Sequence, residues 1–374
     1  MNTKICCIFN LAPLYRFRIY KLMNEELGCD FYFGDKIETT IKKLDYKGLD
    51  GFKKEVENKK IFNTSFIWQK GVVGLVFKRE YKYFILTGDS SILSNWMIAF
   101  FALLLNKKVY LWMHGLKSEL SWKGKLFTYP LYYMANKFLL YGDYSKAVMV
   151  KKGFNPNKMV CIYNSLDYDI QLSIRKDLIK TNIYIDYFNN DLPVLIYIGR
   201  IQKSKKINLI IDAMSILKDK NILCNLVIVG SDSENTGIEE KIVNNKFEKN
   251  VWMYGACYEE KKIAELIFNA DVCVSPGNIG LTAIHAMSYG TPCITHNNLT
   301  KQMPEFEAIQ IGKTGDFFKE NDISDLSNKI EKWLSLESVK REKIRNACYT
   351  VIDEKYNPHY QVQVLKELIK TEKI

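Results

Sequence analysis

Apolar residues run in short continuous blocks along most of this chain, and amphipathic stretches separate the blocks. In the second half, VLIYIGR (194–200), LVIVG (226–230) and DVCVS (271–275) show no alternation of apolar and polar positions. Strands of this kind are buried on both faces, as in a parallel sheet that helices cover. The pattern therefore predicts an α/β fold in which strands and helices alternate.

The predicted elements fall into two successive runs. The first run has strands near 4–9, 29–33, 83–87, 108–112 and 137–141, and helices near 15–27, 92–105, 123–135 and 144–152. The second has strands at 194–200, 226–230, 251–255, 271–275 and 293–295, and helices at 207–219, 237–245, 259–269, 281–289 and 323–335. Two such runs predict two doubly wound domains that face each other across a cleft at the carboxyl ends of their strands.

The domain limits follow from length and composition. A chain of 374 residues suits two domains. The charged and then Asn-rich stretch between 167 and 192 ends in a turn, so we place an N-terminal domain at 1–170 and a C-terminal domain at 190–350. A final helix at about 352–374 is expected to pack back on the first domain.

Composition excludes several classes of protein. Hydrophobic residues make up 47% and charged residues 25%, which is typical of a globular chain. Nine scattered cysteines without C-x-x-C spacing indicate reduced thiols in a cytosolic protein, with no metal site. No targeting segment is evident. The apolar window 96–105 is half the ~20 residues of a membrane span, so it predicts a buried helix.

The net charge of +11 favours binding to an anionic partner such as a nucleic acid, an anionic membrane or a phosphorylated ligand. No nucleic-acid-binding module is recognisable. Basic and aromatic residues instead interleave in RFRIYKLM (16–23), VFKREYKYF (76–84) and KGKLFTYPLYYM (123–134). A single such cluster is explained equally well as an ordinary solvated surface. Three clusters in the first half of the chain favour docking on an anionic membrane.

Two segments of the second half suit a diphosphate. After the strand that ends at Gly199, Arg200 offers a forked donor and Lys205 a point charge just before a helix. Further on, a glycine-bearing loop leads into a helix at Gly280, Leu281 and Thr282. A helix start offers free N–H groups and the positive end of the helix dipole to a phosphate.

In order and wording, these segments resemble the donor-binding motifs of nucleotide-sugar-dependent glycosyltransferases of family 4 (group 1). GRIQKSKK (199–206) resembles the family's G-R-x-x-x-x-K-G, with Lys206 in place of the second glycine. SPGNIGLTAIHAMSYGTP (275–292) resembles P-S-x-x-E-G-x-G-L-x-x-x-E-A-M-x-x-G-x-P. The two glutamates of that pattern fall on Gly277 and His285.

The resemblance implies the GT-B architecture, two Rossmann-like domains, and assigns roles on the donor side. Arg200 and Lys205 would hold the diphosphate beside Gly199 and the helix start, with Gly230 at a neighbouring turn and Tyr254 near the nucleotide base. His285 stands where the family places its ribose contact. Glu305 and Glu307, on the loop after CITH (293–296), are candidates to meet the sugar hydroxyls. Glu259 and Glu260 are interpreted as first-turn helix charges rather than ligands.

On the acceptor side, the resemblance points to His114 at the end of a strand and to the NLAPLYRF loop (10–17). Arg16 and Arg18 could meet an acceptor phosphate there. Asn164 and Ser165 are interpreted as structural.

The implied function is a hexosyl transfer from a nucleotide diphosphate sugar to a hydroxyl of a lipid-linked or oligosaccharide acceptor in lipopolysaccharide, O-antigen or capsule assembly. His114, Glu307 and His285 are the catalytic candidates. The resemblance implies retention of configuration, with no cofactor and no metal, in the cytoplasm or peripherally on the cytoplasmic face of the inner membrane. A sugar-nucleotide epimerase of the same architecture and a non-catalytic sugar-nucleotide binder remain alternatives. A dehydrogenase is the least favoured alternative, because no G-x-G-x-x-G follows the first strand.

Overall fold

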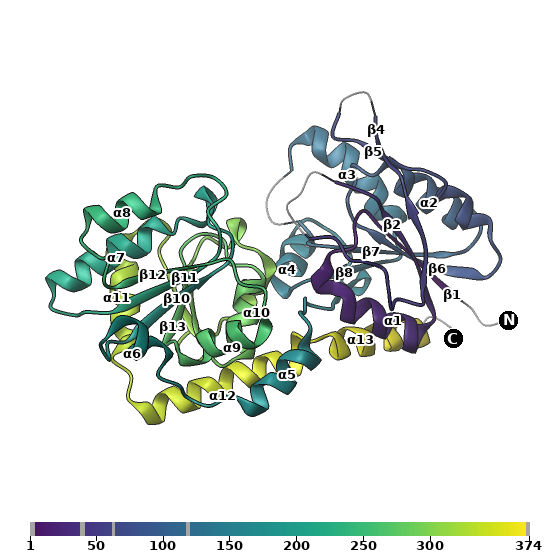
Figure 1. The fold of residues 1–374 in the computed structure, drawn as a ribbon. Helices are drawn as coiled ribbons and strands as arrows, with labels where there is room; N and C mark the ends of the chain where they lie inside the picture. The colour runs from purple at the N-terminus through teal and green to yellow at the C-terminus, as the bar shows by residue number, and fades with distance from the viewer. Residues whose placement is uncertain (1–3, 38–41, 62–63, 117–119, 372–374) are drawn as a thin grey trace. The chain divides into compact units, whose positions relative to one another are not determined.

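The computed structural model describes residues 4–37, 42–61, 64–116 and 120–371. The chain forms two compact units (Figure 1). Unit 1 comprises residues 1–167 together with 358–374, and unit 2 comprises 168–357. Within the described residues, none of the helices combines the length and the apolar character that a membrane span requires.

A seven-stranded parallel sheet organises the described part of unit 1, with strand order β3-β2-β1-β6-β7-β8-β9. Its strands are β1 (Lys4–Phe9), β2 (Cys29–Gly34), β3 (Phe52–Val56), β6 (Tyr81–Thr87), β7 (Lys108–Met113), β8 (Lys137–Leu140) and β9 (Met159–Cys161). A separate antiparallel pair consists of β4 (Asn58–Lys60) and β5 (Ile67–Gln69). The strands predicted in this half are all present, whereas the short edge strands β3 and β9 were not predicted.

Helices cover both faces of this sheet. They are α1 (Phe17–Leu27), α2 (Leu93–Leu104), α3 (Trp122–Met134), α4 (Asp143–Lys151) and α13 (Pro358–Thr371), with short 3-10 turns η1 (Leu14–Arg16), η2 (Val73–Phe77) and η3 (Pro156–Lys158). One core joins α1 and α13 to one face of the sheet, and a second core joins α2, α3 and α4 to the other. Successive strand residues alternate between these cores: Cys7 belongs to the first and Cys6 to the second.

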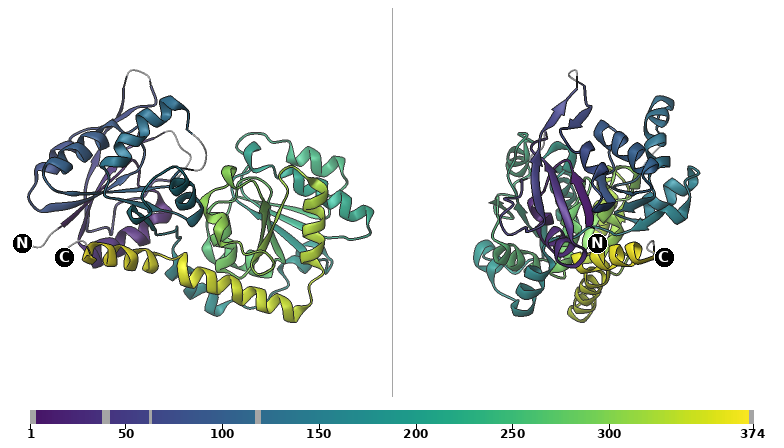
Figure 2. Two further views of the ribbon diagram at one scale, coloured as in Figure 1. Left: turned by 180° about the vertical axis from the view of Figure 1, so that it is seen from behind. Right: turned by 90° about the vertical axis from the view of Figure 1, so that its right-hand side faces the viewer.

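The last helix of the chain, α13, belongs to unit 1 and lies along α1 (Figures 1 and 2). Leu365 is fully buried there. Gln361 accepts a hydrogen bond from Ser165 Oγ (2.7 Å) and donates Nε2 to the carbonyl of Tyr163 (2.9 Å). The predicted helix at 352–374 is thus shorter than expected, because the preceding helix continues to Lys355 in unit 2 and a new one starts at Pro358, a residue suited to a first helical turn.

Unit 2, which the structure describes completely, has a six-stranded parallel sheet in the order β12-β11-β10-β13-β14-β15. The strands are β10 (Val194–Ile198), β11 (Asn225–Val229), β12 (Val251–Gly255), β13 (Val272–Ser275), β14 (Cys293–His296) and β15 (Gly315–Phe318). Its helices are α5 (Tyr168–Asp177), α6 (Ile183–Phe188), α7 (Asn208–Asp219), α8 (Ile238–Asn244), α9 (Glu260–Asn269), α10 (Leu281–Ser288), α11 (Ile323–Leu334) and α12 (Ser338–Lys355), with 3-10 turns η4 (Lys203–Lys205), η5 (Leu299–Lys301) and η6 (Pro304–Ala308).

Two sequence-based expectations about unit 1 are wrong. The window 96–105 was predicted as a buried helix, yet α2 buries only one side: Leu103 and Leu104 are 62% and 66% exposed. The cluster 16–23 was predicted to be part of a docking surface, but Ile19, Tyr20, Leu22 and Met23 are buried against the sheet. In both cases the sequence correctly indicates apolar or basic-aromatic residues. Which of them are exposed depends on the elements that pack against each side of the helix.

In each sheet the order of the strands reverses once. In unit 1 the chain builds outward from β1 through β2 to β3, and then restarts on the other side of β1 with β6. In unit 2 the same reversal separates β10 from β13. At such a point the connections leave in opposite directions, so a crevice opens beyond the carboxyl ends of the two central strands.

The docking of α13 on unit 1 leads to a stability prediction. Leu365→Ala should lower the free energy of unfolding of unit 1 by about 2–5 kcal/mol, because it removes a fully buried side chain and leaves a cavity. Urea denaturation followed by circular dichroism measures this. Val339→Ala, at an exposed position of α12, should change stability by less than about 0.5 kcal/mol. An unchanged midpoint in Leu365→Ala would contradict the packing of α13.

Candidate functional site

The strand reversal of unit 2 brings three glycines together at the carboxyl ends of β10, β11 and β13. Gly199 and Arg200 follow β10 directly, and Gly277 lies two residues after β13. Gly230, which follows β11, lies so close to Gly199 that a Cβ on it would overlap the Gly199 carbonyl oxygen. Gly230 is therefore required for close backbone packing beneath the crevice, whatever else it contacts.

Lys205 reaches across this crevice to the loop after β13. Its Nζ donates to the carbonyl oxygen of Asn278 (2.7 Å) and to the side-chain oxygen of the same residue (2.8 Å). Burial and the nearby Arg200 guanidinium lower the pKa of Lys205 to about 8, and Glu305 partly offsets this shift. The partly buried Lys205 ammonium and the exposed Arg200 guanidinium repel each other, so an anion that neutralises both would suit this position.

Gly277 and Lys205 also pack backbone against backbone. The Gly277 N–H donates to the Lys205 carbonyl (2.9 Å). A Cβ on Gly277 would overlap the Ser204 carbonyl and lie 2.6 Å from the Lys205 Cα. The loop in this conformation therefore has no space for the glutamate of the group 1 pattern, which explains physically why this sequence has a glycine there.

Hydrogen bonds from β14 and the turn that follows it hold the glycine loop in place. Thr295 Oγ1 donates to the Ser275 carbonyl (2.8 Å), and the side-chain oxygen of Gln302 accepts the Ile279 N–H (2.8 Å). Gln302 also donates Nε2 to Thr295 Oγ1 (2.9 Å). Because these partners are buried, the loop is presented as a rigid surface.

Helix α10 begins at this loop, as the sequence predicts. Gly280 is its N-cap and makes no side-chain capping bond, since it has no side chain. The Thr282 hydroxyl is committed within the protein, because it donates to the Ile198 carbonyl at the end of β10 (2.9 Å). The helix start and the end of β10 are thereby joined, so that the backbone N–H groups near Leu281, rather than the hydroxyl, are available for a phosphate.

The two acidic candidates of η6 differ in exposure. Glu305 is buried, and a Cβ on Gly280 would lie 3.9 Å from its Oε2, so its carboxylate adjoins the start of α10. Glu307 is half-buried.

Tyr254, the predicted base contact near the end of β12, is also half-buried, and burial raises its pKa.

His285 belongs to a polar cluster that the sequence does not reveal. Its Nε2 lies 2.9 Å from Glu260 Oε1, which also accepts hydrogen bonds from the Tyr289 hydroxyl (2.7 Å) and Gln171 Nε2 (3.1 Å). Burial alone would raise the pKa of Glu260, but the bonds from His285, Tyr289 and Gln171 outweigh it and lower that pKa to about 2. Glu260 is thus an ionised carboxylate beside the imidazole.

Glu260 was interpreted as a first-turn helix charge, and it is the first residue of α9. The predicted position at the start of a helix is therefore right, but the sequence did not predict the contacts of Glu260, because its partners come from α5 and α10.

Lys206, where the pattern has glycine, adopts φ +51° and directs its Nζ to Glu320 (3.0 Å) and Asn321 (2.7 Å). A left-handed lysine costs roughly 1–2 kcal/mol relative to glycine.

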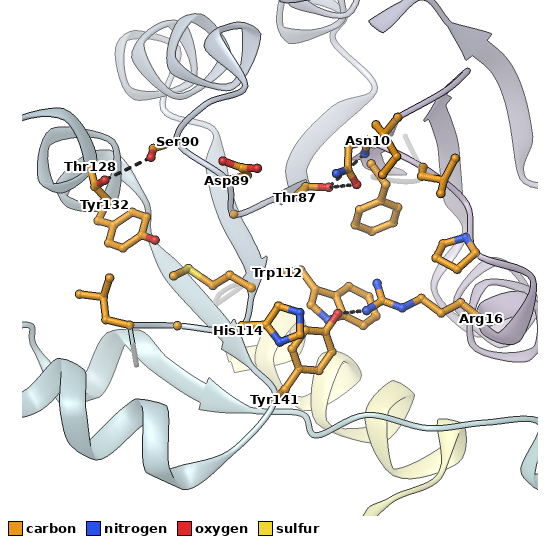
Figure 3. Close-up of a pocket in the computed structure, with 18 of the residues that line it drawn as sticks. Asn10, Arg16, Thr87, Asp89, Ser90, Trp112, His114, Thr128, Tyr132 and Tyr141 are labelled. Carbon is orange, nitrogen blue, oxygen red and sulfur yellow. Dashed lines mark hydrogen bonds between the residues drawn. The ribbon is translucent and has the colours of Figure 1, made fainter. Parts of the chain in front are cut away.

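The strand reversal of unit 1 forms a pocket of about 490 Å³ (Figure 3). Residues at the carboxyl ends of the central strands line it: Asn10 after β1, Thr87 and Asp89 at the end of β6, His114 after β7 and Tyr141 after β8. Asn10 and Thr87 bind each other across the two strands, the Asn10 N–H donating to Thr87 Oγ1 (3.2 Å). Most of these residues were not singled out in the sequence, although each lies at or just after the end of a predicted strand.

Arg16 forms one wall of this pocket. Its guanidinium donates to the Tyr141 hydroxyl and lies over the rings of Trp112 and Tyr141, 5.3 and 5.2 Å from their centres. Its Nε and the Trp112 Nε1 are buried and have no hydrogen-bond partner among the described residues. The pocket thus has aromatic faces beside a guanidinium, a combination suited to a sugar or an anionic group. Arg18, the other predicted arginine, does not line it.

His114 stands at the rim. Its ring centre lies 4.8 Å from that of Tyr141, and the side chain is exposed (Figure 3). Gly115 turns the chain immediately after it with φ +72°, and a Cβ there would lie 2.7 Å from the Cβ of Ser145. This turn lets β7 end with the histidine facing the pocket.

Comparison with known proteins fits this picture. Residues 182–351 match the family described as glycosyl transferases group 1, and this range lies inside unit 2. The match covers most of unit 2, so this part of the chain is similar to the group 1 glycosyltransferases. A search of curated proteins by sequence found no match.

Solved structures show the same architecture for the whole chain. A structure of HepE from Anabaena in complex with UDP is 15% identical, with 99% of this chain and 100% of that one covered and a TM-score of 0.75. A glycosyltransferase from Rickettsia africae is 16% identical, with 99% of each chain covered and a TM-score of 0.75. The lipopolysaccharide outer core galactosyltransferase WaaB, in its apo form, is 15% identical, with 99% and 100% covered and a TM-score of 0.71.

The GT-B fold expected from the sequence is therefore confirmed, and the family model matches the segment that carries the resemblance. The roles of the individual site residues remain predictions.

The cationic pair of unit 2 gives the first test of the site. Arg200→Ala and Lys205→Ala should each weaken binding of UDP about ten- to a hundredfold, because each removes a charge-assisted hydrogen bond worth roughly 1.5–3 kcal/mol. Isothermal titration calorimetry measures the affinity. Lys203→Ala, in the same turn η4 but exposed, is the matched control and should bind as the parent does. Parent-like affinity in both variants would rule out this anion site.

The lowered pKa of Lys205 gives a second test. Only the protonated amine attracts a diphosphate, and a bound anion would raise the pKa of Lys205 from its lowered value. Affinity for UDP should therefore be steady between about pH 7, where the terminal phosphate is ionised, and pH 8, and fall above pH 8 by up to about tenfold per pH unit between the free and bound pKa values. Lys205→Gln should remove this decline. A decline of equal size in that variant would assign the titration to another group.

Proposed function

We propose that this protein is a group 1 glycosyltransferase that moves a hexosyl group from a nucleotide diphosphate sugar to a hydroxyl of a lipid-linked or oligosaccharide acceptor. The observation that carries the proposal is the convergence of Arg200, Lys205 and the start of α10 at the strand reversal of unit 2. A diphosphate leaving group needs fixed positive charge at this kind of position. The structure of HepE with UDP supports a nucleotide ligand for the fold.

In the proposed reaction, the bond between the anomeric carbon and the diphosphate oxygen breaks, and its electron pair stays on the diphosphate. Arg200, Lys205 and the N–H groups of α10 stabilise the charge that develops there, a task that a metal ion performs in other enzymes. The acceptor oxygen bonds to the anomeric carbon and gives up its proton. We propose a metal-independent, cofactor-free and retaining reaction, as the family resemblance implies.

Unit 1 supplies the acceptor pocket in this proposal. Its aromatic walls at Trp112 and Tyr141 suit the apolar face of a sugar ring, and Asn10 and Asp89 offer polar contacts to hydroxyls. We propose that His114, whose ring packs near that of Tyr141, accepts a proton from an acceptor hydroxyl. Arg16 would meet a phosphate or another acidic group of the acceptor.

On the donor side, Glu305 and Glu307 are proposed to meet the hydroxyls of the transferred sugar. His285 is proposed to make the ribose contact, with Glu260 fixing the orientation of its ring. The loss of a carboxylate at Gly277 removes one sugar contact, and Glu307 is the proposed replacement.

The proposed pathway is assembly of a surface polysaccharide: lipopolysaccharide, O-antigen or capsule. The likeness to WaaB, a lipopolysaccharide galactosyltransferase, supports this class of product. A lipid-linked acceptor would place the enzyme at the cytoplasmic face of the inner membrane. An epimerase or a non-catalytic binder would bind the same donor, so binding alone does not separate them from a transferase.

Product analysis tests the proposed function. With UDP-sugars as donors and a panel of oligosaccharide and lipid-linked acceptors, release of UDP should require both a donor and an acceptor. Glu307→Gln keeps size and removes charge, and His114→Ala removes the proposed base; each should lower kcat about a hundredfold while the fold is retained. Glu248→Gln, at an exposed position of unit 2, is the control.

Three results would change the proposal. Conversion of the donor sugar without any acceptor would support an epimerase. Donor binding without turnover over the whole panel would support a non-catalytic binder. Full activity in both variants would remove Glu307 and His114 from the catalytic residues without affecting the proposed reaction.

A further inference from the structure

Unit 1 carries a continuous group of large apolar side chains exposed to solvent. They lie on α2, on the residue that follows it and at the end of η2: Phe77, Met97, Phe100, Leu103, Leu104 and Leu105. We refer to these six residues as the α2 face. A single exposed apolar residue needs no explanation, but a continuous group of this size indicates a surface that binds something.

The α2 face is the outer side of a well-packed helix rather than a loosely attached segment. Ile98, Ala99 and Ala102 on the opposite side of α2 are fully buried in the core of unit 1. The Phe101 ring lies between the rings of Phe77 and Phe100, 5.1 and 5.5 Å from them. The exposed side chains are therefore held on a rigid support.

The neighbouring helix α3 extends this surface. It covers the same side of the sheet as α2, and the two helices are in contact (Figures 1 and 2). Trp122, Leu126 and Tyr133 are each more than half exposed. Their spacings of four and seven residues place them along one stripe of the helix. Trp122 also lies under Lys123, whose Nζ is 5.5 Å from its ring centre.

Basic residues outnumber acidic ones in the segments that carry this surface. Between residues 90 and 142, the stretch that contains both helices, the sequence has six lysines and a single acidic residue, Glu119. Directly after Phe77, the exposed side chains of Lys78, Arg79 and Lys82 add to the excess, against one acidic residue, Glu80. Apolar side chains bordered by lysine and arginine are complementary to a layer of anionic headgroups above hydrocarbon.

Unit 2 offers an internal comparison. Its exposed large apolar residues, such as Ile179, Leu223, Val243 and Val339, come from separate loops and helices. The grouping on α2 and α3 is thus a property of one face of unit 1 and not of the chain in general.

We propose that the α2 face and the exposed stripe of α3 dock into an anionic lipid bilayer. The twelve residues of α2 span about 18 Å, too short to cross a bilayer of about 30 Å but sufficient to lie within its interface. Phe100, Leu103 and Leu104 enter the acyl boundary, and the basic residues contact headgroup phosphates. The inference extends the proposed function, because a lipid-linked acceptor is held in such a bilayer.

Vesicle co-sedimentation with the full chain tests the docking. Binding is expected to vesicles of phosphatidylcholine mixed with phosphatidylglycerol, to be weaker for phosphatidylcholine alone, and to decrease with added salt. L103E combined with L104E should weaken binding about tenfold or more, because both side chains are exposed in the free protein and buried in the bound state. Lys78→Glu combined with Arg79→Glu should cause a similar loss at low salt.

Matched controls use exposed residues of unit 2. Ile179→Glu combined with Val243→Glu repeats the apolar change, and Lys249→Glu combined with Lys340→Glu repeats the charge change; both should bind vesicles as the parent does. Circular dichroism verifies that each variant is folded. Binding that the Leu103 and Leu104 pair does not alter, or no binding to either vesicle, would overturn the proposal.

A second copy of the chain is the other occupant to exclude. If light scattering shows a dimer that the L103E and L104E pair dissociates, and vesicles are not bound, the face is an interface between copies and the proposal fails. Because no substrate is present, these results are independent of the transferase assay. Transfer to a soluble oligosaccharide acceptor should be equal in the parent and the Leu103 and Leu104 pair.

Discussion

The reversal of strand order in each parallel sheet is the constraint on which the candidate sites depend. A parallel sheet leaves the carboxyl ends of its strands at one edge, and the loops there diverge only where the order reverses. In unit 2 this point lies between β10 and β13 and collects Arg200, Lys205 and the glycine loop. In unit 1 it lies between β1 and β6 and forms the pocket of Arg16 and His114. Both candidate sites therefore follow from the order of the strands in the two sheets.

Within the unit 2 site, close backbone packing and charge act together. Gly230 against Gly199 and Gly277 against Lys205 leave no space for side chains, so these glycines bring the cationic segment against the loop after β13. As a consequence, the Lys205 ammonium is partly desolvated, which lowers its pKa. Asn278, where the group 1 pattern has glycine, provides two oxygen acceptors for that ammonium. A diphosphate bound at this position would have to compete with these acceptors for the Lys205 ammonium.

The opposite surfaces of unit 1 show how context decides the role of similar residues. The basic-aromatic sequence of α1 is folded inward, because α13 returns from the end of the chain to cover it. The apolar sequence of α2 is buried on one side only, because no described element covers its outer side. One segment therefore supports the sheet, whereas the other leaves an apolar side exposed to solvent.

The sequence by itself determined the class of fold, the two doubly wound runs, most strands and helices, and the donor motif around Gly199 to Lys205 and Gly280. These features are local, since continuous apolar strands, glycine loops and helix starts are set by residues close together in the chain. Tertiary structure alone decided the contacts between distant segments. Glu260 meets His285 across 25 residues, Lys205 meets Asn278 across 73, and Gln361 meets Ser165 across 196. It also decided which side of α2 is exposed, because a helix that is apolar all round carries no local signal for the face that its neighbours leave uncovered.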